Sequence, residues 1–121
     1  MRGKLIAGAL LSGALLSLPR ACHAHAFLDH ADPKVGSAVQ SSPPALTLTF
    51  TEGVEPAFSK IDVVDGDGQV VAVGGLEHPD ESTLRVSLPT LRAGPYKVKW
   101  KVVSVDTHET EGTFQFSVKS P

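Results

Sequence analysis

Hydrophobic and polar residues alternate with a period of two in four segments after residue 44. In one of these segments the hydrophobic positions are Tyr96, Val98, Trp100 and Val102, and lysines fill the positions between them. Successive side chains of a β-strand point to opposite faces, so this pattern predicts strands with one buried and one solvated face. The four predicted strands are residues 45–51, 83–88, 95–102 and 113–119.

Turn-forming residues separate further segments that have the character of strands. We predict additional strands at 26–31, 58–64 and 69–73, and a hairpin turn between the last two at the sequence DGDG, residues 65–68. No stretch carries hydrophobic residues at helical spacing. About seven short strands in one domain predict an all-β fold, a small Greek-key β-sandwich or barrel of the immunoglobulin-like or cupredoxin-like type.

The first 24 residues follow a different pattern, that of an export signal. Two basic residues precede a largely apolar run at 5–18, and a Pro-Arg pair ends it. This run is shorter than the ~20 apolar residues that a membrane-spanning helix needs. We therefore predict a cleavable signal peptide at 1–24, with a membrane anchor as the alternative, and a single domain at 25–121.

Two cleavage positions satisfy the preference of signal peptidase for small residues. Cleavage after Ala24 leaves His25 at the N-terminus, whereas cleavage after Ala26 leaves Phe27 there. The preference of the peptidase alone does not separate the two positions. A third possibility is lipidation of Cys22, although the Pro-Arg-Ala sequence before it matches a lipoprotein signal poorly.

Removal of residues 1–24 changes the charge and the redox chemistry of the chain. The segment contains three of the 11 Lys and Arg residues and none of the 13 Asp and Glu, so 8 basic residues remain against 13 acidic ones and the net charge becomes −5. Such an acidic domain is a poor candidate for binding nucleic acid or an anionic membrane. The one cysteine leaves with the segment, which excludes a disulfide and a thiolate metal site. An exported domain without disulfides fits a bacterial periplasm.

Two conspicuous features are expected to be structural. The lysines at 97, 99 and 101 occupy alternate positions of a strand, and we interpret them as a solvated face that discourages edge-to-edge pairing rather than as a basic binding stripe. The sequence DGDG is too short for a calcium-binding loop and is interpreted as a turn.

Four residues form the candidate metal site. Asp106 and His108 are two positions apart, so an extended segment would project both side chains to the same side, and Glu52 follows another predicted strand. Alone, an Asp-x-His pair is also typical of a solvated surface loop. If His25 is the first residue, its α-amine and its ring Nδ1 can chelate one metal together, with His108 as a second imidazole and Asp106 or Glu52 as the oxygen donor.

A nitrogen-rich, roughly tetragonal ligand set of this kind favours Cu(II), with zinc as the main competitor. The amine must lose its proton to bind, so we expect affinity to weaken as pH falls. Cu(I) prefers sulfur donors, and the only methionine is Met1. A methionine-rich Cu(I) site is therefore absent from residues 25–121.

The chain from His25 onward resembles the CopC family of periplasmic copper-resistance proteins. The resemblance lies in HAFLDHADPKVGS at 25–37, LTFTEGVEPAFSKI at 48–61 and LRAGPYKVKWKVVSVDTHETEGTFQFSV at 91–118. It implies a Greek-key β-barrel or sandwich that binds Cu(II) for sequestration or delivery, alongside an inner-membrane partner of the CopD type. By motif matching, the family's ligands fall on His25, Asp106 and His108, and a glutamate implicated in some members falls on Glu52.

The resemblance also favours cleavage after Ala24, because only that cut places the histidine first. Some members carry a second, methionine-rich Cu(I) site, and the corresponding segment here, VGGLEHPDES, contains His78 but no methionine. We therefore expect a Cu(II)-only protein in which His78 is a loop residue and His30 has a surface or supporting role.

Two alternatives to a copper carrier remain open at this point. A histidine-brace copper monooxygenase also uses an N-terminal histidine, but a single Trp and a single Tyr, both expected in a core-facing strand, make a flat sugar-binding face hard to build. A metal-free immunoglobulin-like module is the other. The favoured hypothesis is a non-enzymatic, periplasmic Cu(II)-binding protein that acts in copper resistance or homeostasis.

Overall fold

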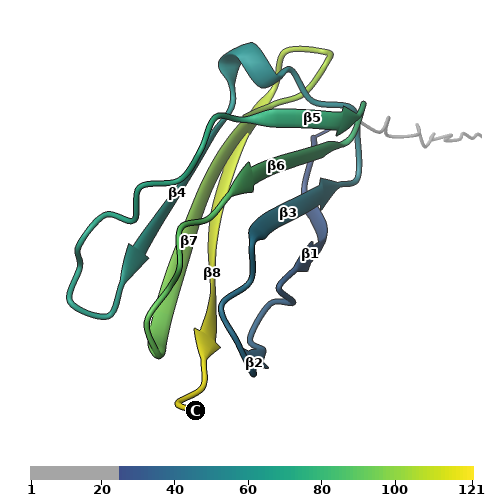
Figure 1. Ribbon diagram of the computed structural model, residues 1–121. Coiled ribbons are helices and arrows are strands. Elements are labelled where there is room, and N and C mark those ends of the chain that lie inside the picture. The colour runs from purple at the N-terminus through teal and green to yellow at the C-terminus, as the bar shows by residue number, and fades with distance from the viewer. Residues whose placement is uncertain (1–24) are drawn as a thin grey trace, which may run out of the picture.

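Two four-stranded sheets pack face to face (Figure 1). The computed structural model describes residues 25–121, so the signal-peptide prediction lies outside the described residues. The first sheet has the order β1-β3-β6-β5, and these strands are Leu28–Asp32, Ala45–Phe50, Thr83–Ser87 and Glu77–Asp80. The second sheet has the order β2-β8-β7-β4, and these strands are Ala38–Val39, Glu109–Val118, Gly94–Val103 and Lys60–Asp65.

The chain crosses repeatedly from one sheet to the other. Only β5–β6 and β7–β8 are consecutive strands that pair within one sheet, and β2–β8 is the parallel pair. A short 3-10 helix, η1, spans Pro56–Phe58. No helix in the described part of the chain has the length and hydrophobicity to span a bilayer. The predicted all-β sandwich is confirmed.

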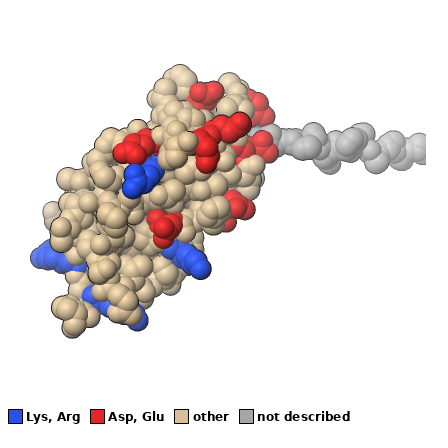
Figure 2. All heavy atoms as spheres, turned by 45° about the vertical axis from the view of Figure 1, so that its right-hand side comes forward, with Lys and Arg blue, Asp and Glu red and all other residues tan. Residues whose placement is uncertain are grey.

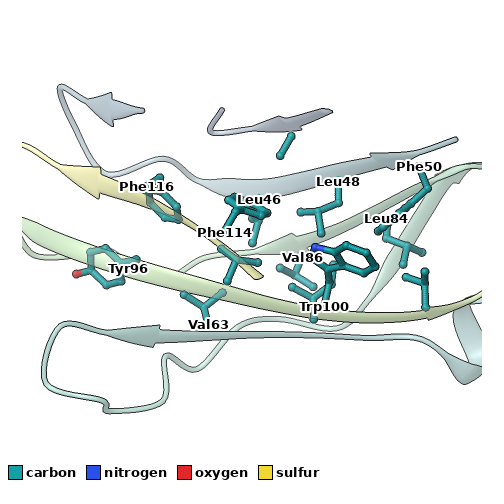
Figure 3. Close-up of a cluster of buried hydrophobic side chains, with 14 of the residues drawn as sticks. Leu46, Leu48, Phe50, Val63, Leu84, Val86, Tyr96, Trp100, Phe114 and Phe116 are labelled. Carbon is teal, nitrogen blue, oxygen red and sulfur yellow. The ribbon is translucent and has the colours of Figure 1, made fainter. Parts of the chain in front are cut away.

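The alternating pattern decides which side chains fill the space between the sheets. Along β7 the hydrophobic positions are buried and the lysines between them are exposed, as predicted. The two inner faces interdigitate (Figure 3), and the core contains Leu46, Leu48, Phe50, Leu84 and Val86 from the first sheet and Val63, Tyr96, Trp100, Phe114 and Phe116 from the second. Burying each Leu or Phe side chain contributes roughly 1.5–3 kcal/mol to folding.

Three parts of the predicted strand pattern are wrong. Residues 69–73 do not form a strand: after the DGDG turn the pairing stops at one isolated bridge between Val64 and Val70. The turn itself is present, and Asp65 Oδ1 accepts the N–H groups of Asp67 and Gln69. The strands β2 and β5 were not predicted, because β2 has two residues and β5 is exposed throughout and contains Pro79.

The lysine face needs one correction. Lys97, Lys99 and Lys101 are exposed, which confirms a solvated face. However, β7 lies between β8 and β4 in its sheet and is not an edge strand, so these lysines do not protect an edge. Instead Lys101 Nζ lies 3.1 Å from Glu109 Oε2 of the neighbouring strand. An exposed pair of this kind contributes little to stability, because water screens it.

Candidate metal centre

Three segments meet at one end of the sandwich: residues 25–27 before β1, the loop after β3, and the β7–β8 loop (Figure 1). Backbone hydrogen bonds join them. Thr51 N–H donates to the carbonyl of Phe27 over 2.8 Å, and Val105 N–H donates to the carbonyl of Gly53 over 3.0 Å. The candidate residues His25, Glu52, Asp106 and His108 all lie on these segments.

The backbone around His25 is held from both sides. Ala26 is completely buried, and its carbonyl accepts a hydrogen bond from Thr110 Oγ1 of β8. On the other side, Thr51 Oγ1 accepts the N–H of Phe27 over 3.0 Å and donates to the carbonyl of His25 over 3.4 Å. The side chain of His25 is itself exposed. The fold thus anchors the chain immediately after His25 and leaves its imidazole at the surface.

The β7–β8 loop is organised by Ser104, a completely buried residue. Its hydroxyl donates to Asp106 Oδ1 over 2.5 Å and accepts the backbone N–H of His108 over 3.2 Å. Its carbonyl accepts the N–H of Thr107, which has a positive φ of 71°. The segment is therefore a tight turn rather than the extended stretch assumed from the sequence.

This turn brings Asp106 and His108 together. Asp106 Oδ1 lies 3.4 Å from His108 Nδ1, and both side chains are about half exposed. The ring of His25 lies beside that of His108, with 4.7 Å between the ring centroids and 47° between the planes. The ring of Phe27 lies near that of His25, with 6.0 Å between the ring centroids. Two imidazoles and one carboxylate thus meet from opposite ends of the chain.

The carboxyl group of Asp106 is kept ionised by its surroundings. The hydrogen bond from Ser104 lowers the pKa of Asp106 below its ordinary value, and the interaction with His108 adds to this effect. Partial desolvation acts in the opposite direction on the same pKa but is outweighed. A charged carboxylate beside an imidazole is suited to binding a cation.

Glu52 is the remaining candidate ligand, and His30 and His78 are the histidines expected not to bind metal. Glu52 is exposed on the loop after β3. His30 pairs with its neighbour Asp29 at 2.8 Å, and His78 is exposed on β5. Among residues 25–121, no group of three or more His, Cys, Asp and Glu side chains is gathered closely enough to hold a metal ion. The side chains alone therefore do not make a closed site.

Ser104, Thr51 and Thr110 are site residues that the sequence interpretation missed. Each acts through a hydroxyl that bonds to a group far from it in sequence or across a turn. For Ser104 only a weak local signal exists, since a serine hydroxyl can bond to nearby groups in a turn. For the two threonines the sequence holds no such signal.

Comparison with known proteins relates the chain to one family. The family model of the CopC domain matches residues 28–119. Protein YobA from Escherichia coli K12 is 36% identical over 99 residues, which cover 79% of this chain and 80% of YobA.

Two solved structures have the same fold as this chain. The crystal structure of CopC from Methylosinus trichosporium OB3b superposes with a TM-score of 0.72 at 37% identity, covering 78% of this chain and 94% of that one. PcoC from Escherichia coli, a methionine-rich copper resistance protein, gives a TM-score of 0.74 at 30% identity, covering 79% of this chain and 100% of that one. The family match includes Glu52, Asp106 and His108 but begins three residues after His25.

Proposed function

This chain belongs to the CopC family of copper-resistance proteins, and on that premise we propose that residues 25–121 form a periplasmic Cu(II)-binding protein. Residues 1–24 would serve as the cleaved signal peptide. The protein would sequester or deliver copper without catalysing a reaction, in partnership with a CopD-type protein of the inner membrane.

The observation that carries this proposal is the pairing of His25 with the Asp106–His108 turn. The ring of His25 lies 4.7 Å from that of His108, and Asp106 Oδ1 lies 3.4 Å from His108 Nδ1. Two atoms bound at right angles to one ion, with bonds of about 2.0–2.1 Å, lie about 3 Å apart. The Asp106–His108 pair therefore needs little rearrangement to bind one metal.

The ligand set we propose is the α-amine and imidazole of His25, the imidazole of His108 and the carboxylate of Asp106, with Glu52 as a further oxygen donor nearby. Nitrogen donors with one oxygen suit Cu(II). The amine is the donor that the side chains lack, because it exists only once His25 is the first residue.

The packing of Ala26 supports cleavage before His25. A chain that began at Phe27 would lose a completely buried side chain and the hydrogen bond that Thr110 donates to the carbonyl of Ala26. A chain that begins at His25 keeps both contacts. The anchoring contacts thus favour the first of the two cleavage positions.

The charge distribution suits a cationic cargo. In Figure 2, Asp and Glu gather toward the upper end of the sandwich, while Lys and Arg lie mostly toward the other end. Exposed carboxylates at the site end include Glu52, Asp106 and Glu109. Clustered negative charge raises the local concentration of cations and the rate at which they are captured.

The test is a Cu(II) titration of protein whose first residue has been verified by intact mass. Protein that begins at His25 is expected to bind one Cu(II) tightly and to give a tetragonal EPR spectrum. A matched protein that retains Ala24 replaces the amine by a peptide amide and is expected to bind more weakly with a changed spectrum. Equal binding by the two proteins would exclude the amine as a ligand, and absence of tight binding by either would refute the proposed function.

We expect the Cu(II) affinity to fall as pH falls from about 8 to about 5. An α-amine has a reference pKa of about 7.7–8.0, and amine and imidazole nitrogens bind metal only after losing their protons. The pKa of Asp106 is lowered, so its carboxylate stays charged throughout that range and is protonated only as pH falls through the depressed value, below its ordinary 3.8. Competition titrations at several pH values measure this, and Asp106→Asn should leave the slope in this range unchanged. An affinity independent of pH would contradict the nitrogen ligand set.

A further inference from the structure

Ser104 is an unusual residue for its place in the molecule. It follows the last residue of β7 and is completely buried, whereas the next four residues of the loop are exposed. A buried hydroxyl is costly unless it is hydrogen-bonded. Ser104 meets this requirement with bonds that all end within the Asp106–His108 turn.

These bonds join both candidate ligands to one residue. The hydroxyl of Ser104 donates to Asp106 Oδ1 over 2.5 Å and accepts the backbone N–H of His108 over 3.2 Å. The backbone N–H of Ser104 donates to the carbonyl of His108, and its own carbonyl accepts the N–H of Thr107, each over 2.8 Å. The same residue forms an antiparallel bridge with Val54, which ties the turn to the loop after β3.

We propose that Ser104 is a positioning residue for the metal centre: its buried hydroxyl fixes the Asp106 carboxylate and the backbone of His108 so that both present their donor atoms to one ion. This inference rests on the proposed Cu(II) function. Ser104 itself does not contact the metal.

The chemistry of the hydroxyl explains why this position requires it. One oxygen atom must donate a proton to a carboxylate and at the same time accept a backbone N–H, which neither an alanine nor a valine can do. Without the hydroxyl, the half-exposed Asp106 side chain is free to rotate among its rotamers, and the ligands must be ordered again when the metal binds. Removing the supporting partners of metal ligands typically lowers affinity by about 10–100-fold.

Ser59 provides a matched control at the same end of the sandwich. Its hydroxyl donates to the carbonyl of Glu55 over 2.8 Å and accepts the N–H of Val103, the neighbour of Ser104, over 3.2 Å. It therefore makes the same two kinds of hydrogen bond, but only to backbone groups and not to a candidate ligand. A loss of local structure without any role in positioning ligands would affect the two serines alike.

The experiment measures Cu(II) affinity, EPR spectra and metal-free thermal stability for protein that begins at His25. Ser104→Ala is expected to lower the affinity by about 10–100-fold and to broaden the EPR spectrum through a less uniform ligand geometry. Ser104→Thr, which keeps the hydroxyl, should recover most of the affinity. Ser59→Ala should keep the wild-type affinity to within about twofold, whatever it does to stability.

A double-mutant comparison separates positioning from general structure. If the hydroxyl acts through the carboxylate, Ser104→Ala should cost less affinity when Asp106 is already alanine than when it is present. Wild-type affinity in Ser104→Ala, or equal losses for Ser104→Ala and Ser59→Ala, would overturn the positioning role while leaving the Cu(II) function intact. Failure of the wild-type protein itself to bind Cu(II) would instead refute the proposed function, and the inference with it.

Discussion

Replacing His108 by alanine is expected to lower the Cu(II) affinity of the protein beginning at His25 by more than about 100-fold, beyond the loss typical of a supporting residue. His108 contacts both other proposed ligands, since its ring lies beside that of His25 and its Nδ1 lies 3.4 Å from Asp106 Oδ1. Its removal takes away an imidazole donor and the partner of both other ligands. His25→Ala keeps an α-amine but loses the chelating ring, so a loss of similar size is expected.

The matched control is His30→Ala. His30 is an exposed histidine of β1 that pairs with Asp29. Its replacement should leave the affinity and the EPR spectrum unchanged. Competition titration against a chelator of known affinity measures all three variants. If His108→Ala and His30→Ala bind Cu(II) equally well, the metal lies elsewhere in the protein.

Phe116→Ala is expected to lower the free energy of unfolding by about 3–5 kcal/mol, the range for a phenylalanine removed from a packed core. Phe116 is only 2% exposed, and its ring stacks on that of Tyr96 with centroids 5.6 Å apart. The loss combines the hydrophobic transfer of the ring with the cavity that it leaves between the sheets. It is a large part of the roughly 5–15 kcal/mol that stabilises a typical domain.

Phe58→Ala is the control for this prediction. Phe58 lies in η1 and is 70% exposed, so its removal should change stability by no more than about 0.5 kcal/mol. Urea unfolding of the metal-free proteins, monitored by circular dichroism, measures both changes. Equal effects of the two substitutions would show that Phe116 does not fill the space between the sheets as described.

The alternating pattern predicted the strands whose one face is buried, because burial is what imposes the alternation. The strands β3, β6, β7 and β8 follow it, and their core positions were predicted correctly. Where neither face is buried, as in β5, hydrophobic and polar residues do not alternate, and the strand cannot be predicted from the pattern. The strand predicted at 69–73 is wrong for a further reason. A turn followed by apolar residues favours a hairpin, but the number of residues that pair across it depends on contacts with other segments.

The candidate site was predicted as a set of residues but not as an arrangement. The spacing of Asp106 and His108 suggested their proximity, although the cause is the turn built by Ser104 and not an extended strand. The approach of His25 to His108 depends on Thr51, in the loop after β3, and Thr110 of β8, which bond to the N-terminal segment although they are distant in sequence. Such contacts follow from the sheet registers, and no one-dimensional pattern contains them. The site assignment itself stays a prediction until copper binding is measured.

Trp100 gives the protein an intrinsic optical probe. It is the only tryptophan in the sequence, it is 7% exposed, and its ring meets Phe50 edge-on with centroids 5.3 Å apart. The indole fits closely over Gly112, where a Cβ atom would lie 2.5 Å from its Cζ2. Phe50 directly precedes Thr51, whose hydroxyl bonds to His25. Fluorescence excited selectively at tryptophan therefore arises from one buried fluorophore in the core, so unfolding, or quenching by a paramagnetic ion, can be followed as a change in a single emitter.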